Sequence, residues 1–396
     1  MLEFDVIVVG AGPTGSVVAG ALARASLRVV LLEEHPNVGL PNHCSGLVSP
    51  RALELAGVAE EMVRVARFSS ARVWGPGGKS FWLRANSVQA VAIDRPRFDQ
   101  ILAQRAANAG ATLMLDTRAY RFEHVAGNVQ VEARTGEDTF RLRAPLLIGA
   151  DGASSRVGRW MSKKRKYEII PAVKADIIFQ GAETDDIEIF VGNSIAPGWF
   201  GWIIPLRDGA ARIGIGATTV LRHCFELFLD LIRHRFGDFV VQETRQASLP
   251  LGPARDFVAD RVMLVGAAAR QTKPTTGGGI YFGLRAAQLA AVTAAQAVER
   301  GDCSRQVLAE YERAWHRSAG RELVYGHWLR RGFRGLSDMG LDLVIKFFGQ
   351  PWAQDWISRL GDMDYPSRLF VPLAVSWRKQ APPEAMRARR RVSLGV

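Results

Sequence analysis

The chain has 396 residues, of which 48% are hydrophobic, and its formal net charge at pH 7 is +12. This length is enough for two or three domains with a large core, and the apolar content excludes an intrinsically disordered chain. No run of about 18 apolar residues occurs, so we expect no transmembrane helix.

The three cysteines, Cys44, Cys224 and Cys303, are odd in number and far apart. We therefore expect neither a disulfide framework nor a metal site, and a reducing, cytoplasmic location. The first apolar run starts almost at the first residue without a basic leader, so we also expect no signal peptide. The positive charge suggests an anionic partner, and scattered basic residues without a recognition motif favour a membrane surface or a phosphate-bearing substrate over nucleic acid.

The first stretch of the chain has the order of a dinucleotide-binding βαβ unit. An apolar run at 6–9 predicts a buried strand, and Gly10, Gly12 and Gly15 follow it at G-x-G-x-x-G spacing. Gly10 allows a tight turn, Gly12 lets the backbone approach a pyrophosphate, and Gly15 lets helix and strand pack closely. Thr14 lies in the same turn and is a further candidate contact.

A helix predicted to end at Ala25 and a second strand over 29–32 complete this unit, and the strand ends at Glu33. A carboxylate at this place can bind the two hydroxyls of an adenosine ribose. The nucleotide is therefore FAD or NAD, and the motif alone does not separate the two.

Residues 35–50 are rich in Gly, Pro, Asn and Ser and form a loop at the carboxyl edge of the sheet, where ligands bind. The loop contains His43, Cys44 and Ser45. Cys44 has two interpretations at this stage, a small buried residue or a thiol beside the cofactor.

The elements that follow alternate between two sheets. A helix over 51–66 precedes a hairpin of strands at 71–74 and 79–84, which we expect to enter a second sheet. Residues 91–95 return to the first domain, and a buried strand at 146–149 ends in Asp151 at a carboxyl edge. The elements expected between them are a helix over 97–109, a strand over 112–115 and a meander of strands at 119–123, 128–134 and 139–143.

Residues 160–252 hold most of the second domain. We expect strands at 172–180, 186–191 and 211–217, a helix over 225–236, and an aromatic segment bounded by Pro197 and Pro205. The basic cluster at 159–166 is expected to be a solvated surface.

The chain then returns to the first domain through a strand at 262–266, a glycine-rich turn at 267–279 and a helix over 280–300. Together these predict a second anion-binding corner, in which we expect Lys273 to be solvated.

Residues 304–360 are expected to be helical. Most of their aromatic side chains are expected in the core, namely Trp315, Trp328, Phe333, Phe347, Phe348, Trp352 and Trp356. The tail at 378–391 carries six basic residues against one acid, which predicts a disordered arm or a membrane-surface contact.

Four segments together resemble the geranylgeranyl reductase family of flavoproteins, which share the fold of p-hydroxybenzoate hydroxylase. They are the first glycine motif, D-R-P-R-F-D at 94–99, A-D-G-A-S-S-R-V-G-R-W at 150–160, and the late strand and glycine-rich turn at 262–280. The resemblance covers about the first 330 residues.

Two features narrow the resemblance to the reductases. Cys44 matches the family's cysteine facing the flavin. The family's P-x-x-Y-x-W-x-F-P motif is retained at Pro197, Trp202 and Pro205, whereas Phe200 and Ile204 replace its Tyr and Phe.

The resemblance implies an α/β (α+β) fold, with a Rossmann-like FAD-binding domain, an interleaved β-sheet substrate domain and a C-terminal helical region. The implied FAD-binding domain is discontinuous and comprises 1–66, 91–159 and 253–300. The substrate domain comprises 67–90 and 160–252, and the helical region with its basic tail comprises 301–396.

The resemblance also implies a bound FAD and hydride addition to carbon–carbon double bonds in a prenyl chain of a lipid, chlorophyll or quinone. Gly10, Gly12 and Gly15 would hold the pyrophosphate and Glu33 the ribose. Further implied FAD contacts are Thr14, Cys44, Ser45, Arg95, Asp151, Gly266, Ala267, Gly278, Gly279 and Ile280. The substrate channel would be walled by Pro197, Trp199, Phe200, Trp202 and Pro205.

The chain departs from the family at two of these places. Ala267 replaces the usual Asp after the late strand, which predicts weaker FAD binding, and Phe200 removes a tyrosine hydroxyl. The proton donor is Cys44 or an ordered water. No second G-x-G-x-x-G is present for NAD(P)H, which fits a ferredoxin-like donor or transient nicotinamide docking.

Two other functions remain open from the sequence. One is an FAD-dependent aromatic or lipid monooxygenase on the same fold. The other is a lipid-binding protein that has lost its flavin, which the Ala267 departure suggests. The basic surface also predicts peripheral binding to an anionic membrane.

Overall fold

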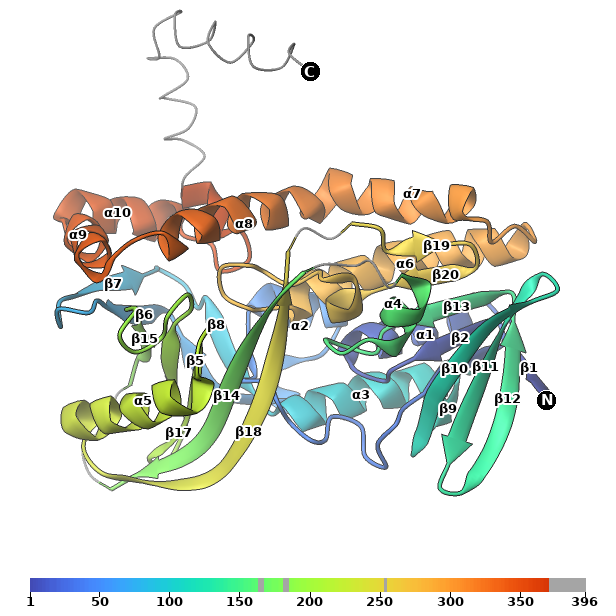
Figure 1. The fold of residues 1–396 in the computed structure, drawn as a ribbon, viewed down its shortest axis with the longest axis horizontal. Helices are drawn as coiled ribbons and strands as arrows, with labels where there is room; N and C mark the ends of the chain where they lie inside the picture. Colours follow the sequence, from blue (N-terminus) through green and yellow to red (C-terminus); the bar gives the residue numbers. More distant parts are fainter. Residues whose placement is uncertain (163–166, 181–184, 253–254, 370–396) are drawn as a thin grey trace, which may run out of the picture.

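The computed structural model describes residues 1–162, 167–180, 185–252 and 255–369. Two large sheets lie at opposite ends of the long axis, and a layer of helices runs along the upper edge above both (Figure 1). The predicted α/β fold class is confirmed.

The first sheet has the strand order β19-β20-β13-β2-β3-β9. Its neighbours pair in parallel except at the β19 edge, and β2 is central. All four residues of β2 are buried, because helices cover one face of this sheet and the antiparallel strands within 117–144 pack on the other. The strands are β2 (Val6–Val9), β3 (Val29–Leu32), β9 (Thr112–Met114), β13 (Leu146–Gly149), β19 (Val258–Ala259) and β20 (Val262–Leu264).

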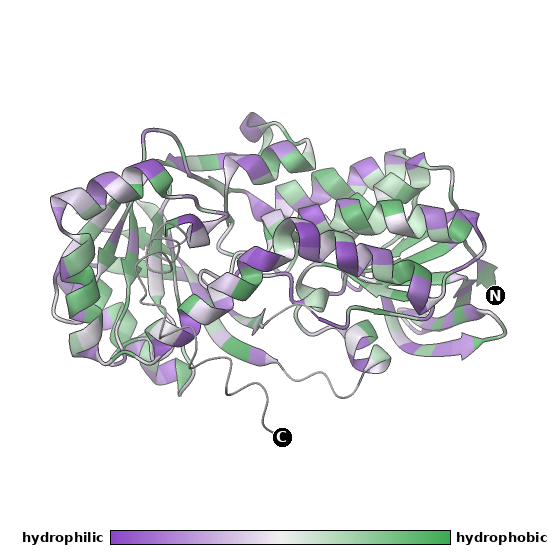
Figure 2. Cartoon of the chain, turned by 90° about the horizontal axis from the view of Figure 1, so that it is seen from above, coloured by the Kyte–Doolittle hydropathy of each residue, from purple (hydrophilic) through white to green (hydrophobic). Residues whose placement is uncertain are grey.

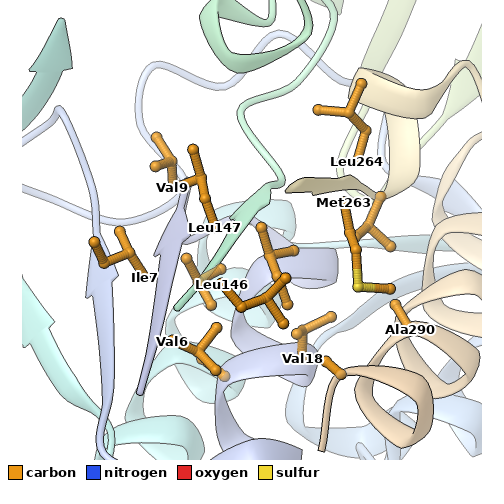
Figure 3. Packing of buried hydrophobic residues seen from close by; sticks show 14 of the residues in the cluster. Val6, Ile7, Val9, Val18, Leu146, Leu147, Met263, Leu264 and Ala290 are labelled. Carbon is orange, nitrogen blue, oxygen red and sulfur yellow. The ribbon is translucent and has the colours of Figure 1, made fainter. Parts of the chain in front are cut away.

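Three helices pack close to this sheet because small residues line their contacts. They are α1 (Pro13–Arg24), α3 (Arg95–Asn108) and the alanine-rich α6 (Ile280–Glu299). Figure 3 shows Val18 of α1 and Ala290 of α6 against side chains of β2, β13 and β20. A Cβ on Gly20 of α1 would lie 3.2 Å from the Ala106 Cα of α3.

The second sheet has the order β18-β14-β17-β16-β15-β6-β7. Phe228 and Ile232 of α5 (Leu221–Phe236) are buried on one of its faces with Ile213 and Ile215 of β17. The strands are β6 (Ser70–Trp74), β7 (Ser80–Arg84), β14 (Glu168–Phe179), β15 (Ile187–Phe190), β16 (Gly201–Pro205), β17 (Ala210–Gly216) and β18 (Phe239–Leu251).

Two smaller sheets complete the fold. The predicted meander forms β10 (Thr117–Val125), β11 (Asn128–Thr135) and β12 (Asp138–Ala144), with β1 (Leu2–Glu3) at its edge. The other has the order β4-β8-β5, with β4 (Leu47–Val48), β8 (Ala90–Ile93) and β5 (Arg64–Phe68). Two short helices, α2 (Pro50–Ala56) and α4 (Arg156–Met161), complete this region.

The C-terminal layer consists of α7 (Arg305–Trp315), a π-helical turn (His316–Gly320), α8 (Arg321–Arg334), α9 (Asp338–Phe348), α10 (Pro351–Leu360) and a 3₁₀ turn, η4 (Pro366–Leu369). The basic tail at 378–391 lies outside the described residues, as does 163–166 of the basic cluster.

Two expectations about the elements are wrong. The helix predicted over 51–66 ends at Ala56, because Gly57 adopts a left-handed φ of 64°, and 64–68 is strand β5. Most of the C-terminal aromatic side chains are not in the core: Trp328, Phe333, Phe347 and Trp352 are exposed. They lie on outward stripes of α8 to α10, whose inward stripes are also apolar.

Candidate flavin and substrate site

The turn between β2 and α1 leaves an open space in front of a helix N-terminus. Gly10 has a φ of 99°, and a Cβ there would lie 2.6 Å from the Ala150 oxygen. A Cβ on Gly15 would lie 1.9 Å from the Gly10 oxygen, so helix and turn require glycine at both places. A Cβ on Gly12 would meet nothing within 4 Å, which leaves room for a pyrophosphate beside the first turn of α1.

Glu33 closes this turn from the end of β3. Its Oε2 accepts a hydrogen bond from the Ala11 N–H at 2.9 Å, and its Oε1 accepts one from the His35 N–H at 3.1 Å. The side chain is largely buried, and Oε2 keeps a second lone pair that a ribose hydroxyl could use.

A cavity of about 440 Å³ lies at the carboxyl edge of the first sheet. Of the predicted cofactor contacts, Gly10, Gly12, Glu33, Cys44, Arg95 and Asp151 line it. Polar residues that were not among the predicted cofactor contacts also line it, namely Glu34, His35, Asn42, His43, Asp99, Thr117, Arg118, Ser154, Arg156 and Arg159. The cavity therefore presents several arginines, which suits a diphosphate.

Arg95 links the cysteine loop to helix α3. Its guanidinium binds Asp99 through two hydrogen bonds of 2.7 and 2.9 Å. Burial alone would lower the pKa of Arg95, but Asp99 and Cys44 raise it, so this group is always charged. Burial raises the pKa of Asp99, an effect that Arg95 opposes. The Cys44 sulfur also accepts a hydrogen bond from the Gly46 N–H at 3.4 Å.

Asp151 acts as a structural cap as well as lining the cavity. Its Oδ2 accepts hydrogen bonds from the Arg156 N–H at 2.7 Å and the Val157 N–H at 3.1 Å, at the start of α4. Burial raises the pKa of Asp151, while the Ser155 hydroxyl and the backbone donors lower it. These hydrogen bonds hold the first turn of α4 beside the cavity, which Arg156 lines.

The second glycine-rich turn meets the first one through Thr14. A Cβ on Gly266 would lie 2.8 Å from the Thr14 Oγ1, and one on Gly283 would lie 2.7 Å from the same atom. Gly266 has a φ of 67°, and its N–H donates to the Gln271 Oε1 at 2.7 Å. Ala267, Gly278, Gly279 and Ile280 belong to this turn and the start of α6, outside the lining of the 440 Å³ cavity.

Lys273 is buried, so the expectation that it is solvated is wrong. Its Nζ donates to the Met363 oxygen at 2.6 Å and lies 3.4 Å from the Asp364 Oδ1. Burial lowers the pKa of Lys273, and Asp364 opposes this effect. The C-terminal segment folds back over the turn, a tertiary contact that local sequence does not reveal.

The aromatic segment lies against strand β17 and reaches the second turn. Trp199 and Phe200 stack at 5.1 Å, and Phe200 meets Trp202 at 6.0 Å, edge to face. A Cβ on Gly216 would lie 2.4 Å from the Trp199 ring, and one on Gly214 would lie 2.2 Å from the Trp202 ring. Gly277 of the second turn lies beside these aromatic rings, since a Cβ placed on it would be 3.4 Å from the Trp199 Cζ2. Pro197 and Pro205 bound the segment, and the 440 Å³ cavity does not include it.

Arg212 of β17 connects the second sheet to the cysteine loop. Its Nη1 donates to the Ser45 oxygen at 3.0 Å and to the Ile93 oxygen at 2.9 Å. Sequence reasoning missed this residue, although a charged side chain between the apolar residues Ala211 and Ile213 was a signal. It also missed Asp99, for which the i,i+4 spacing from Arg95 was a signal.

Comparison with known proteins agrees with this geometry. The FAD binding domain family model matches residues 3–323. Digeranylgeranylglycerophospholipid reductase 2 of Methanopyrus kandleri is 33% identical, with 87% of this chain and 90% of the relative covered. Digeranylgeranylglycerophospholipid reductase of Methanothrix thermoacetophila is 32% identical, over 87% of this chain and 91% of the relative. The chain belongs to the geranylgeranyl reductase family of flavoproteins.

A solved structure supports the same conclusion for this geranylgeranyl reductase. The geranylgeranyl bacteriochlorophyll reductase-like protein of Thermoplasma acidophilum has a TM-score of 0.83 and 26% identity, over 93% of this chain and 98% of that one. The protein is an FAD-dependent reductase. FAD fits the residues present: the space before Gly12, the buried Glu33 carboxylate and the arginines of the cavity match a pyrophosphate and a ribose.

Proposed function

We propose that this geranylgeranyl reductase saturates the geranylgeranyl chains of a digeranylgeranylglycerophospholipid. The observation that carries this proposal is the 33% identity to a relative bearing that name, over most of both chains. The net charge of +12 fits a substrate with an anionic phosphate headgroup.

The site residues have separate roles in this proposal. Gly10, Gly12, Thr14 and Gly15 would hold the FAD pyrophosphate, and Glu33 the ribose. The second turn, with Gly266, Ala267, Gly278, Gly279 and Ile280, would lie at the ribityl chain and flavin ring. The wall of Trp199, Phe200 and Trp202, bounded by Pro197 and Pro205, would hold the apolar prenyl chain beside that turn and exclude water.

Reduced FAD supplies a hydride when bound, and one proton completes the saturation of each double bond. Cys44 is the proposed proton donor, because it lines the cavity together with Arg95. Arg212, through the Ser45 carbonyl, would keep the loop in place.

We further propose that the electrons come from a ferredoxin-like protein or from transiently docked NAD(P)H, and that the enzyme works at the surface of an anionic membrane. Within the described residues, no helix is long and apolar enough to span a bilayer.

The substrate class can be tested by product analysis. The reduced enzyme is incubated separately with a digeranylgeranyl phospholipid, a geranylgeranyl ester that mimics the chlorophyll side chain, and a prenyl quinone. Mass spectrometry should show added hydrogens in the phospholipid first, with the highest rate. Faster reduction of the ester or the quinone would contradict the proposed substrate.

A further inference from the structure

Helix α9 and the start of α10 carry four large apolar side chains that face outward. Met339, Leu343 and Phe347 follow one another at four-residue spacing and are 77, 63 and 45% exposed, and Trp352 is 55% exposed. The rings of Phe347 and Trp352 meet at 4.9 Å, so the four side chains form one continuous apolar strip. The opposite stripe of α9, with Ile345, is already buried against Phe81 of the second sheet.

Helix α8 carries a second outward stripe, which combines aromatic and basic residues. Tyr325 and Trp328 are 52 and 64% exposed and lie between Arg321 and Arg331 in the sequence. The Arg331 guanidinium lies 5.7 Å from the Trp328 ring. Trp and Tyr are the residues that favour the interface between water and lipid. Figure 1 places α8 to α10 in the upper layer, and Figure 2 views the molecule from that side.

The charge on these helices is divided between the two sides. Three of their acidic side chains are engaged with the body of the protein: Glu322 binds Ser367, Asp338 binds Asn193 and Asp342 binds the Gly77 N–H. The exposed Asp355 is paired with Arg359 on α10 itself. By contrast, no ion-pair partner is found for Arg321, Arg331 or Lys346 among the described residues. The outward side therefore presents cations together with apolar groups.

We propose that this outward side of α8 to α10 docks on an anionic phospholipid bilayer. The apolar strip would enter the boundary between headgroups and acyl chains, and Arg321, Arg331 and Lys346 would meet lipid phosphates. The proposal deepens the proposed function, because a reductase of phospholipid chains must reach its substrate in a membrane. It commits to a lipid surface and not to a second copy of the chain.

The test uses the full-length protein and sedimentation with vesicles of phosphatidylglycerol or phosphatidylcholine. The variant Leu343→Ser/Phe347→Ser removes the centre of the apolar strip. The control Val220→Ser/Val292→Ser removes two apolar side chains elsewhere that are 70 and 60% exposed. We expect the first variant to lose at least tenfold in partitioning to phosphatidylglycerol, and the second to bind like the wild type. Equal binding by the strip variant and the wild type would overturn the proposal.

A charge variant tests the same surface independently of the apolar strip. Arg321→Gln/Arg331→Gln should weaken binding to phosphatidylglycerol several-fold, whereas Arg222→Gln/Arg233→Gln on α5 should not. Light scattering reports whether the wild type is a dimer. If the strip variant turns a dimer into a monomer while vesicle binding is unchanged, a second copy covers the strip and the proposal is wrong.

Activity separates this proposal from the proposed function. The strip variant should reduce a detergent-solubilised prenyl phospholipid at the wild-type rate and the same lipid in vesicles at a lower rate. If the wild type reduces neither form but the strip still controls vesicle binding, the substrate assignment fails and the docking surface stands.

Discussion

Cys44 is the proposed proton donor, and its role can be tested by substitution. Cys44→Ala should retain FAD, because the cradle of Gly10 to Gly15 is untouched, but slow the reoxidation of reduced flavin by prenyl lipid at least tenfold. Stopped-flow absorbance measures this rate. Cys224→Ala, in the core of the second sheet, is the matched control and should leave it unchanged. An unchanged rate in Cys44→Ala would make Cys44 a packing residue.

Ala267 should limit the affinity for FAD. An Asp at this position would add a hydrogen bond to a charged group, about 1.5–3 kcal/mol before repulsion from the phosphates is subtracted. We expect the wild type to be purified with incomplete FAD and Ala267→Asp to bind FAD roughly tenfold more tightly. Fluorescence titration of the apoprotein measures both affinities. If the wild type already binds FAD tightly and Ala267→Asp binds it more weakly, the second turn contacts FAD differently from the way proposed here.

Lys273 of the glycine-rich turn at 267–279 forms a buried ion pair with Asp364, and the contribution of this pair to stability can be measured. Lys273→Met leaves a buried carboxylate without its cation and should cost about 3–5 kcal/mol of unfolding free energy. The double variant Lys273→Met/Asp364→Leu should recover most of this loss, because no buried charge then remains. Urea unfolding at saturating FAD measures the free energies. A double variant as unstable as the single one would show that the Met363 contact, not the charge pair, matters.

The residues of the first turn could be predicted because their roles follow from local order. A strand, three glycines and a terminal carboxylate predict where Gly10, Gly12 and Glu33 lie. Lys273 and Arg212 could not be placed in this way, because their partners, Asp364 and Ser45, are far away in the sequence. Only the folded chain brings these groups together.

At the scale of elements, the segment 362–365 after α10 contacts two helices and the second turn. Asp362 binds Arg51 of α2 at 2.9 Å, and Tyr365 meets Tyr281 of α6 at 3.1 Å. Burial acts to raise the pKa of Asp362, but Arg51 and two backbone N–H groups lower it below its ordinary value. At pH values above the unfolded pKa of about 3.9, a carboxyl with a lowered folded pKa stabilises the folded state. This stabilisation is lost as the pH falls through the folded pKa.

The pH dependence of stability tests this contact. Arg51→Met should lower the melting temperature at pH 6. Its difference from the wild type should shrink as pH falls through the lowered folded pKa of Asp362, because the carboxyl is then protonated in both proteins. The control Arg222→Met breaks an exposed ion pair with Glu226 on α5, and its melting temperature should differ little from that of the wild type at any pH. A difference between Arg51→Met and wild type that stays constant from pH 6 to about pH 2 would exclude the Asp362 contact as its cause.

Most strands could be predicted from apolar runs and turn residues, as at β2, β13 and the meander β10 to β12. The region 51–66 could not, because the apolar residues of a short helix and of strand β5 follow one another closely and mimic one long helix. Gly57, in its left-handed conformation, was the available stop signal.

At the scale of the whole molecule, the proposed site residues come from both large sheets, because the chain crosses between the sheets repeatedly. The aromatic wall comes from the second sheet, while both glycine turns come from the first. The order of the motifs along the chain predicted that the aromatic segment and the glycine turns belong to different sheets. The sequence could not predict which face of α8 to α10 is exposed. Both faces of these helices are apolar, and only packing separates them.

The measurement that decides the function is a single anaerobic turnover. The enzyme-bound FAD is photoreduced, mixed with a digeranylgeranyl phospholipid, and followed by flavin absorbance and by mass spectrometry of the lipid. We expect the flavin to be reoxidised as the lipid gains hydrogen, and a fully saturated phospholipid to leave the flavin reduced. Flavin that stays reduced without oxygen, whether or not later admission of air yields a hydroxylated lipid, would contradict the assignment of this protein as a prenyl reductase.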